Sequence, residues 1–174
     1  MISTENQSEL STWLCERIGL VASPALRCIG VLRNGTIVGC VGFDQHNGAS
    51  LVMHCAGEPG WLTRELIGVV FQYAFNVCKV KMVIGLVPLG NKDALRFNTH
   101  LGFKTRLVLE DAHPDGALVL MTMLRRECRY IYRGEHGQEI STSPRTGLHS
   151  TCEADCCRPA EAASASNGSQ QAEP

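Results

Sequence analysis

The chain has 174 residues, of which 44 % are hydrophobic and 19 % are charged, and its formal net charge is −1. This length predicts a single domain. The near-neutral charge gives no indication of a nucleic-acid or anionic-membrane partner. Every apolar run is broken before about 18 positions, so no membrane-spanning helix is predicted. The polar N-terminus lacks the basic and apolar regions of a secretory signal, which predicts a cytoplasmic protein.

The last quarter of the chain differs in composition from the rest. Residues 1–132 carry 13 Lys and Arg against 11 Asp and Glu, whereas residues 133–174 carry 3 against 6. No aromatic residue follows Tyr132. Such a segment buries too little apolar surface to offset the entropy of ordering it. We therefore predict one domain over residues 1–132, followed by a disordered acidic tail over residues 133–174.

The nine cysteines predict reduced thiols rather than a disulfide framework. Six of them occur singly in apolar segments, where cysteine behaves as a small hydrophobic residue. Their odd number and the missing secretory signal favour the reduced state. The other three, Cys152, Cys156 and Cys157, follow His149 in the tail. Their spacing fits no standard zinc pattern, so no metal site is predicted.

The first half of the domain is predicted to contain one helix and a three-stranded meander. Leu10, Leu14 and Ile18 recur at helical spacing, with Gly19 placed to end the helix. Asn34-Gly35 lies between two β-rich runs and is a strong hairpin signal. The predicted elements are a helix over 7–18 and strands over 27–33, 36–43 and 49–56.

The second half alternates helices and strands. An apolar stripe predicts a largely buried helix, and the continuous apolar run after it is typical of a central strand. The predicted elements are a helix over 61–77, a strand over 81–87, a helix over 91–101 and a hairpin of strands over 103–110 and 117–124. This order predicts an α/β (α+β) fold with a mixed, mostly antiparallel central sheet flanked by helices.

One motif carries a family resemblance. The segment Asn91-Lys-Asp-Ala-Leu-Arg-Phe-Asn-Thr-His-Leu-Gly-Phe103 matches the pattern Asn-x-x-Ala-x-x-Phe-Tyr-x-x-x-Gly-Phe at Asn91, Ala94, Phe97, Gly102 and Phe103. Residues 27–132 therefore resemble the GCN5-related N-acetyltransferase (GNAT) superfamily. The chain would be a divergent member, with a phage-encoded protein of the host cytoplasm as one option.

The resemblance implies an acyl-CoA N-acyltransferase fold and acetyl-CoA as cosubstrate. It implies direct attack of an amine on the thioester in a ternary complex, with a small-molecule or protein amine as acceptor. The pantetheine arm would lie between the strands over 49–56 and 81–87, and the pyrophosphate would lie at the start of the helix near Trp61. The cofactor-binding residues implied are Cys55, Ala56, Gly57, Gly60, Trp61, Leu62, Thr63, Arg64, Asn91, Ala94 and Phe97.

Two positions depart from the family pattern. The pyrophosphate loop Gln/Arg-x-x-Gly-x-Gly/Ala is replaced by Glu58 to Thr63, although Gly57 and Gly60 could serve as close-approach positions. Asn98 stands where the family places a tyrosine that protonates the leaving thiolate, and an amide only hydrogen-bonds. General-acid catalysis contributes about 10²–10⁴-fold. Since a thiol with a pKa near 8.5 is already a tolerable leaving group, transfer would be slowed and still feasible.

His54 and Asn98 are the predicted catalytic residues. An imidazole on the central strand can act as a base near neutral pH, and the alternative for His54 is a hydrogen-bonded core residue. Two functions remain open at this stage. One is an N-acetyltransferase, and the other is a catalytically degenerate binding or structural protein of the same fold. The free edge of the final hairpin also allows a homodimer.

Overall fold

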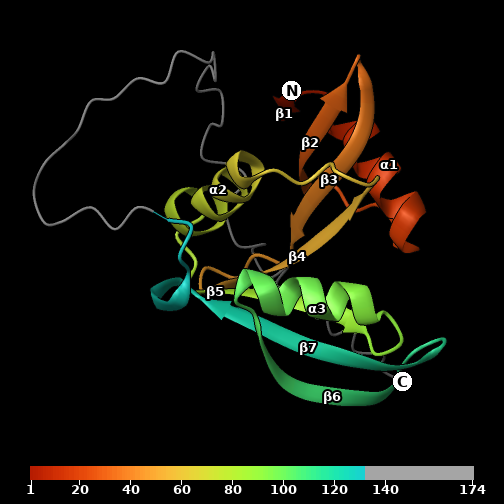
Figure 1. The fold of residues 1–174 in the computed structure, drawn as a ribbon, viewed down its shortest axis with the longest axis vertical. Helices are drawn as coiled ribbons and strands as arrows, with labels where there is room; N and C mark the ends of the chain where they lie inside the picture. Colours follow the sequence, from red (N-terminus) through yellow and green to blue (C-terminus); the bar gives the residue numbers. More distant parts are fainter. Residues whose placement is uncertain (132–174) are drawn as a thin grey trace, which may run out of the picture.

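The computed structural model describes residues 1–131, so the tail predicted over residues 133–174 lies outside the described part. The described residues form one seven-stranded sheet in the order β1-β2-β3-β4-β5-β7-β6 (Figure 1). In chain order the elements are β1 (Ile2–Ser3), α1 (Gln7–Ile18), β2 (Arg27–Arg33), β3 (Thr36–Asp44), β4 (Ser50–Gly57), α2 (Arg64–Gln72), the π-helix η1 (Tyr73–Val77), β5 (Met82–Pro88), α3 (Lys92–Leu101), β6 (Lys104–His113), β7 (Gly116–Leu124) and the 3₁₀ turn η2 (Arg125–Glu127).

The predicted meander is confirmed. Asn34 and Gly35 both have positive φ, at 52° and 80°, which is the backbone that a type I′ turn requires. A strand that the sequence did not predict, β1, pairs antiparallel with β2 through Ile2 opposite Val31. Two residues are too few to show an alternating pattern, so the sequence carried no periodic signal for β1.

Helix α1 packs closely on one face of β2, β3 and β4. Two glycines make this approach possible, because a Cβ on Gly30 would lie 2.3 Å from Leu10 Cδ2 and one on Gly42 would lie 2.5 Å from Leu14 Cδ2. The small core that results also contains Cys15, Cys28 and Cys40. These cysteines are free thiols among the described residues and pack as small apolar side chains.

Helix α2 covers the opposite face of the same strands and is shorter than predicted. The predicted helix over 61–77 is wrong at its start, because the Thr63 hydroxyl accepts a hydrogen bond from the Leu66 amide at 3.1 Å and caps a helix that begins at Arg64. Its predicted end at Val77 is confirmed, because α2 continues as the π-helix η1, in which the Cys78 amide bonds to the Tyr73 carbonyl. Leu66 and Phe71 are the buried anchors of α2.

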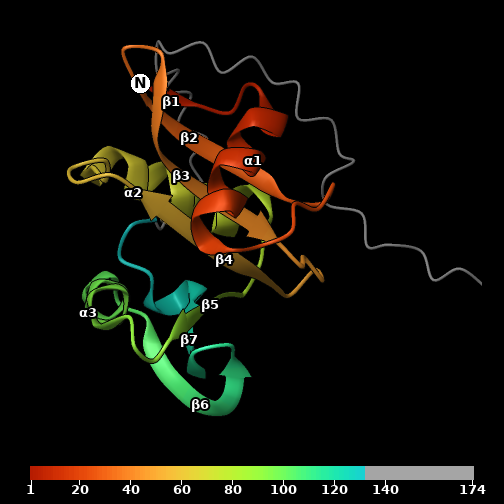
Figure 2. The ribbon, with the colours of Figure 1, turned by 90° about the vertical axis from the view of Figure 1, so that its right-hand side faces the viewer.

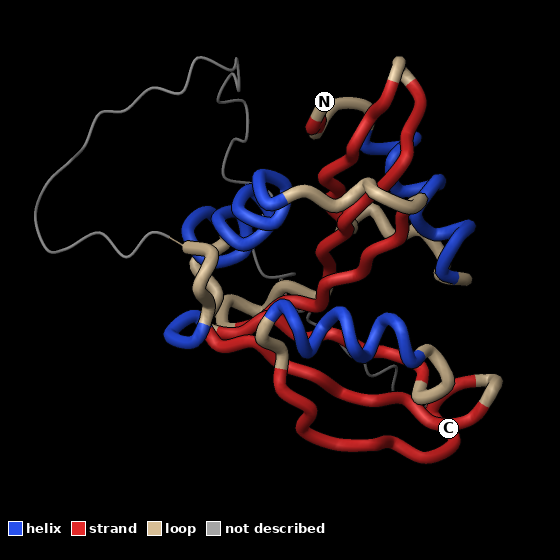
Figure 3. The backbone as a smooth tube through the Cα atoms, in the orientation of Figure 1, coloured by secondary structure: helices blue, strands red, loops and turns tan. Residues whose placement is uncertain are grey.

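The sheet parts in its middle. Strands β4 and β5 are parallel and pair over only three positions, the last being Val52 opposite Ile84. Beyond that point β4 stays paired with β3 as far as Gly57, while β5 stays paired with β7 as far as Pro88. Figure 3 shows the two groups of strands diverging. The central position predicted for β5 is confirmed.

Helix α3 covers the β5–β7 half of the sheet on the same side as α2, whereas α1 lies on the other side (Figure 2). Asn91 caps α3 by accepting a hydrogen bond from the Ala94 amide at 3.0 Å, and Gly102 ends it with φ 107°. Phe103 is buried beneath α3 and contacts Phe71. Within residues 1–131 no helix is long and apolar enough to cross a membrane.

The packing of α1 predicts the effect of a cavity. Leu14 is fully buried, so Leu14→Ala should lower the free energy of unfolding by about 2–5 kcal/mol. Urea denaturation of the full chain measures this loss. Leu20→Ala is the matched control, because Leu20 lies just beyond α1 and is exposed. Equal effects of the two substitutions would contradict the packing of α1 described above.

Candidate functional site

The divergence of β4 and β5 leaves main-chain groups facing each other across a gap. Within residues 1–131, positions 53–57 of β4 and 85–88 of β5 have no strand partner on the sides that face one another. Unpaired strand edges can bind an extended ligand as if it were an added strand. A slot of this kind suits a linear molecule that carries amide groups.

A small, partly enclosed apolar space lies beside this slot. It measures about 20 Å³, which is room for about one water molecule, since roughly 10–15 Å³ of such volume holds one. A ligand larger than water can enter only when the side chains around it move. Those side chains belong to Val41, Met53, Cys55, Trp61, Leu62, Ile67, Val70, Phe71, Phe97 and Leu101.

Trp61 lies on a pair of glycines at the end of the β3–β4 ladder. Gly39 and Gly57 are direct partners in that ladder. A Cβ on either would lie 2.2–2.3 Å from the Trp61 indole. Gly57, predicted to let a phosphate approach, therefore accommodates this ring. Gly60 has φ 77° in a turn closed by the Trp61 amide and the Glu58 carbonyl, and a Cβ there would meet open space.

The start of α2 presents main-chain donors to solvent. The first hydrogen bond inside the helix runs from the Ile67 amide to the Thr63 carbonyl at 3.1 Å, so the amides of Arg64 and Glu65 precede it. Thr63 and Arg64 are exposed. A helix N-terminus with a basic side chain beside it can bind an anion. The cap itself uses the Thr63 hydroxyl, so the cofactor role predicted for Thr63 rests on its main chain.

His54 forms a polar pair with Asp44, a residue that the sequence reasoning missed. The His54 Nε2 atom lies 3.1 Å from Asp44 Oδ1, and both side chains are largely buried. A carboxylate only accepts hydrogen bonds, so the neutral imidazole donates from Nε2 and keeps Nδ1 as an acceptor. His54 shares the α1 face of the sheet with its partner Gly42, and it lies two positions beyond the last β4–β5 pair. The register of the β3–β4 hairpin could have indicated that Asp44 lies near His54, because it sets residue 44 opposite residue 52.

Asn98 and the other predicted residues of α3 have structural partners. The Asn98 side chain is buried and donates from Nδ2 to the Ala94 carbonyl at 2.9 Å. Asn91 serves as the helix cap. Phe97 reaches the apolar space together with Cys55, Trp61 and Leu62. The structure thus gathers four of the predicted cofactor residues, whereas the elements that carry His54 and Asn98 lie on opposite faces of the sheet.

Cys55 projects from β4 into the apolar space. Burial raises the pKa of the Cys55 thiol to about 11, so the group stays protonated near neutral pH. A protonated thiol is a poor nucleophile. Cys55 is therefore unsuited to act as a nucleophile near neutral pH. Its neighbour Ala56 lies on the other face and packs against the α1 core.

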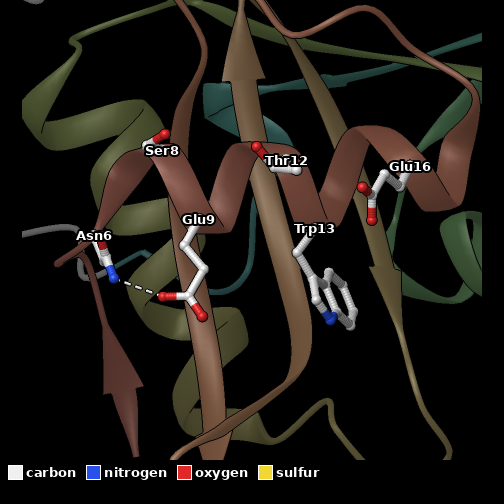
Figure 4. A pocket seen from close by; sticks show the side chains of 6 residues that line it. All are labelled: Asn6, Ser8, Glu9, Thr12, Trp13 and Glu16. Carbon is white, nitrogen blue, oxygen red and sulfur yellow. Dashed lines mark hydrogen bonds between the residues drawn. The ribbon is translucent and has the colours of Figure 1, made fainter.

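A shallow hollow of about 390 Å³ on the outer side of α1 receives no ligand assignment (Figure 4). Asn6 and the exposed face of α1 form its walls. The Arg17 guanidinium already lies 3.6 Å from the centre of the Trp13 ring. The described residues also contain no group of three or more metal-ligating side chains, and the cysteines of the tail lie outside them.

The fold of this chain is similar to that of solved acetyltransferase structures. Spermidine N-acetyltransferase from Vibrio cholerae, in complex with CoA and spermine, superimposes with a TM-score of 0.53 at 18 % identity over 69 % of this chain and 76 % of that chain. The fold is the GNAT acetyltransferase fold. A protein described as an acetyltransferase gives a TM-score of 0.55 at 22 % identity over 65 % of this chain and 64 % of that chain. No protein-family model matches the sequence, and no curated protein matches it.

A spermidine N-acetyltransferase chimera from Vibrio cholerae and hSSAT gives a TM-score of 0.51 at 19 % identity, over 67 % of this chain and 75 % of the chimera. The likeness therefore extends over about two thirds of the chain. The fold class predicted from the sequence is confirmed.

The glycine pair beneath Trp61 predicts a spectroscopic change. In a Trp13→Phe background, Gly39→Ala should displace the indole, shift its fluorescence to longer wavelength and lower the melting temperature, because the new Cβ would overlap the ring. Gly68→Ala is the matched control, since a Cβ at Gly68 meets no atom within 4 Å. An unchanged spectrum for Gly39→Ala would contradict the position of Trp61.

Proposed function

We propose that the protein is an N-acetyltransferase that transfers the acetyl group of acetyl-CoA to an amine. The observation that carries this proposal is the parting of β4 and β5 after three pairs, which leaves positions 53–57 of β4 without a strand partner on that side. The fold and the free amides at the start of α2 support it. Acetyl-CoA fits the unpaired main chain of β4 and the free amides at the start of α2, because its pantetheine arm carries two amides and its pyrophosphate is an anion.

The proposed cofactor contacts follow the slot from β4 to α2. The main chain of Cys55, Ala56 and Gly57 would bond the pantetheine amides. The segment from Gly60 to Arg64 would hold the pyrophosphate with main-chain amides, the helix dipole and the Arg64 charge. The α3 side of the slot would be formed by Asn91, Ala94 and Phe97. Trp61 and Leu62 must move aside, because the apolar space is only about 20 Å³.

We propose His54 as the general base and Asp44 as the residue that orients it. The Nδ1 atom would first accept a proton from the acceptor ammonium, and the neutral amine so formed would attack the thioester carbon with its lone pair. The carbon–sulfur bond then breaks, the CoA sulfur leaves with the electron pair, and the second proton passes from the nitrogen to that sulfur to give CoA thiol and the amide. The protonated imidazole would be stabilised by the Asp44 carboxylate.

The proposed acceptor is a small-molecule or protein amine, and neither nucleic acid nor a membrane is proposed as a partner. Polyamines come first in the test panel because the Vibrio cholerae neighbour is a spermidine N-acetyltransferase. A cytoplasmic setting is proposed because the six described cysteines are free thiols. A homodimer is proposed as well, formed through strand β6 at the edge of the sheet.

Calorimetric titration of the full chain with acetyl-CoA tests the proposed cofactor. Saturable binding at one site is expected, and about 100 times the dissociation constant should stabilise the fold by about 2.7 kcal/mol. Arg64→Glu should weaken binding roughly fivefold, or about 1 kcal/mol, because it reverses a charge beside the pyrophosphate. The control Arg96→Glu reverses an exposed charge on α3. No binding by the unmodified chain would reject the proposal.

A second experiment tests the base. With an amine that the protein acetylates, His54→Gln should lower kcat/KM by about 10²–10⁴-fold at pH 7. Asp44→Asn should give a smaller loss, because the imidazole keeps its place and loses only the carboxylate that orients it. His100→Gln, on the exposed side of α3, is the control, and equal rates for all four proteins would exclude His54 as the base.

A degenerate binding protein with this fold is the second candidate. One observation favours it, namely that Trp61 and its neighbours already fill the space beside the slot. Under this alternative Trp61 is a permanent part of the core. Acetyl-CoA would then neither bind nor change the Trp61 fluorescence, and the chain would acetylate no amine in the panel.

A further inference from the structure

Strand β6 is an unprotected edge. The sheet ends at β6, which within residues 1–131 pairs on one side only, with β7. Leu107 is 54 % exposed and Val108 is 45 % exposed, although successive side chains point to opposite faces of a strand. Neither face of the strand is therefore covered at its middle. The unpaired main-chain groups of an edge strand can pair with another chain.

The charges of β6 are arranged so that the strand complements itself. Its first half carries Lys104 and Arg106, and its second half carries Glu110 and Asp111. Residues 107–109, between these charges, are Leu-Val-Leu. An antiparallel copy of the strand reverses this order, so the basic half of each strand would lie beside the acidic half of the other. Opposite charges across a strand pair stabilise it, and like charges destabilise it.

The register of the β6–β7 ladder leaves this middle regular. Its irregularities fall between Thr105 and Leu107 and between Leu109 and His113, so positions 107–109 keep an extended backbone between them. On the face away from α3, Leu107 lies opposite Leu120 and Leu109 lies opposite Leu118. Bulges of this kind usually blunt an edge strand, but here they flank the apolar stretch and do not interrupt it.

We propose that β6 pairs antiparallel with β6 of a second copy of this chain about a two-fold axis at Val108. In that register position 106 lies opposite position 110, position 107 lies opposite position 109, and Val108 meets its own copy. The interface is isologous, since the same strand serves both sides. The two seven-stranded sheets become continuous, and the leucines of both copies form one apolar stripe. This proposal does not depend on acetyl transfer.

Sedimentation of the full chain at about 100 μM tests the interface. A species of twice the 18.9 kDa chain mass is expected. Val108→Lys should convert it to monomer, because the axis sets each new charge against its own copy. Val21→Lys is the control, since Val21 is 94 % exposed in the loop after α1. A monomeric unmodified chain would overturn the proposal and leave the acetyltransferase proposal intact.

Charge exchange separates this pairing from general adhesion and does not rely on the Val108 variant folding. Arg106→Glu and Glu110→Arg should each weaken the dimer, because each places like charges opposite one another. The double variant should restore it. Far-ultraviolet circular dichroism confirms that each variant is folded. A dimer that survives Val108→Lys, or a double variant that stays monomeric, would show that β6 is not the interface.

Discussion

The structure depends on how little β4 and β5 pair with each other. Three parallel pairs hold the two halves of the sheet together, and beyond them each strand follows its antiparallel neighbour. A parallel pair requires a crossover between its strands, and here α2 and η1 provide it. The crossover therefore begins after the end of β4, where β4 and β5 have already parted. It places the first turn of α2 at that end of the slot. The free main-chain amides at the start of α2, and with them the proposed site, are placed by this one crossover.

The second constraint is the tryptophan that closes the slot. Its indole needs two adjacent positions without side chains, and the β3–β4 register supplies Gly39 beside Gly57. These two glycines present no side chain to the ring, whereas Val41 and Cys55, the next pair on the same face, line the apolar space beside it. Trp61 is thus the residue on which the two candidate functions differ, since it is either a movable cover or part of a permanent core. The His54–Asp44 pair lies on the other face of β4 and is untouched by that choice.

Much of the fold could be predicted because its signals are local. The Asn34-Gly35 turn, the glycine after each of α1 and α3, and the Asn91–Phe103 motif each act through neighbouring residues, and the structure confirms them. The start of α2 was misplaced because Trp61 and Leu62 extend the apolar stripe of the helix. Their side chains pack from the preceding loop instead. The partners of His54 and Trp61 could not be read locally, since they depend on which strand positions face each other. The tail lies outside the described residues, so its predicted disorder stays a prediction.

Amide hydrogen exchange of the full chain, with and without acetyl-CoA, shows whether the cofactor binds where β4 and β5 part. Acetyl-CoA should slow exchange in two separate stretches, residues 53–57 on β4 and residues 62–66 at the start of α2, while exchange in the exposed strand β6 is unchanged. Protection confined to other parts of the chain, or none at saturating acetyl-CoA, would contradict the claim that the parting of β4 and β5 forms an acyl-CoA site.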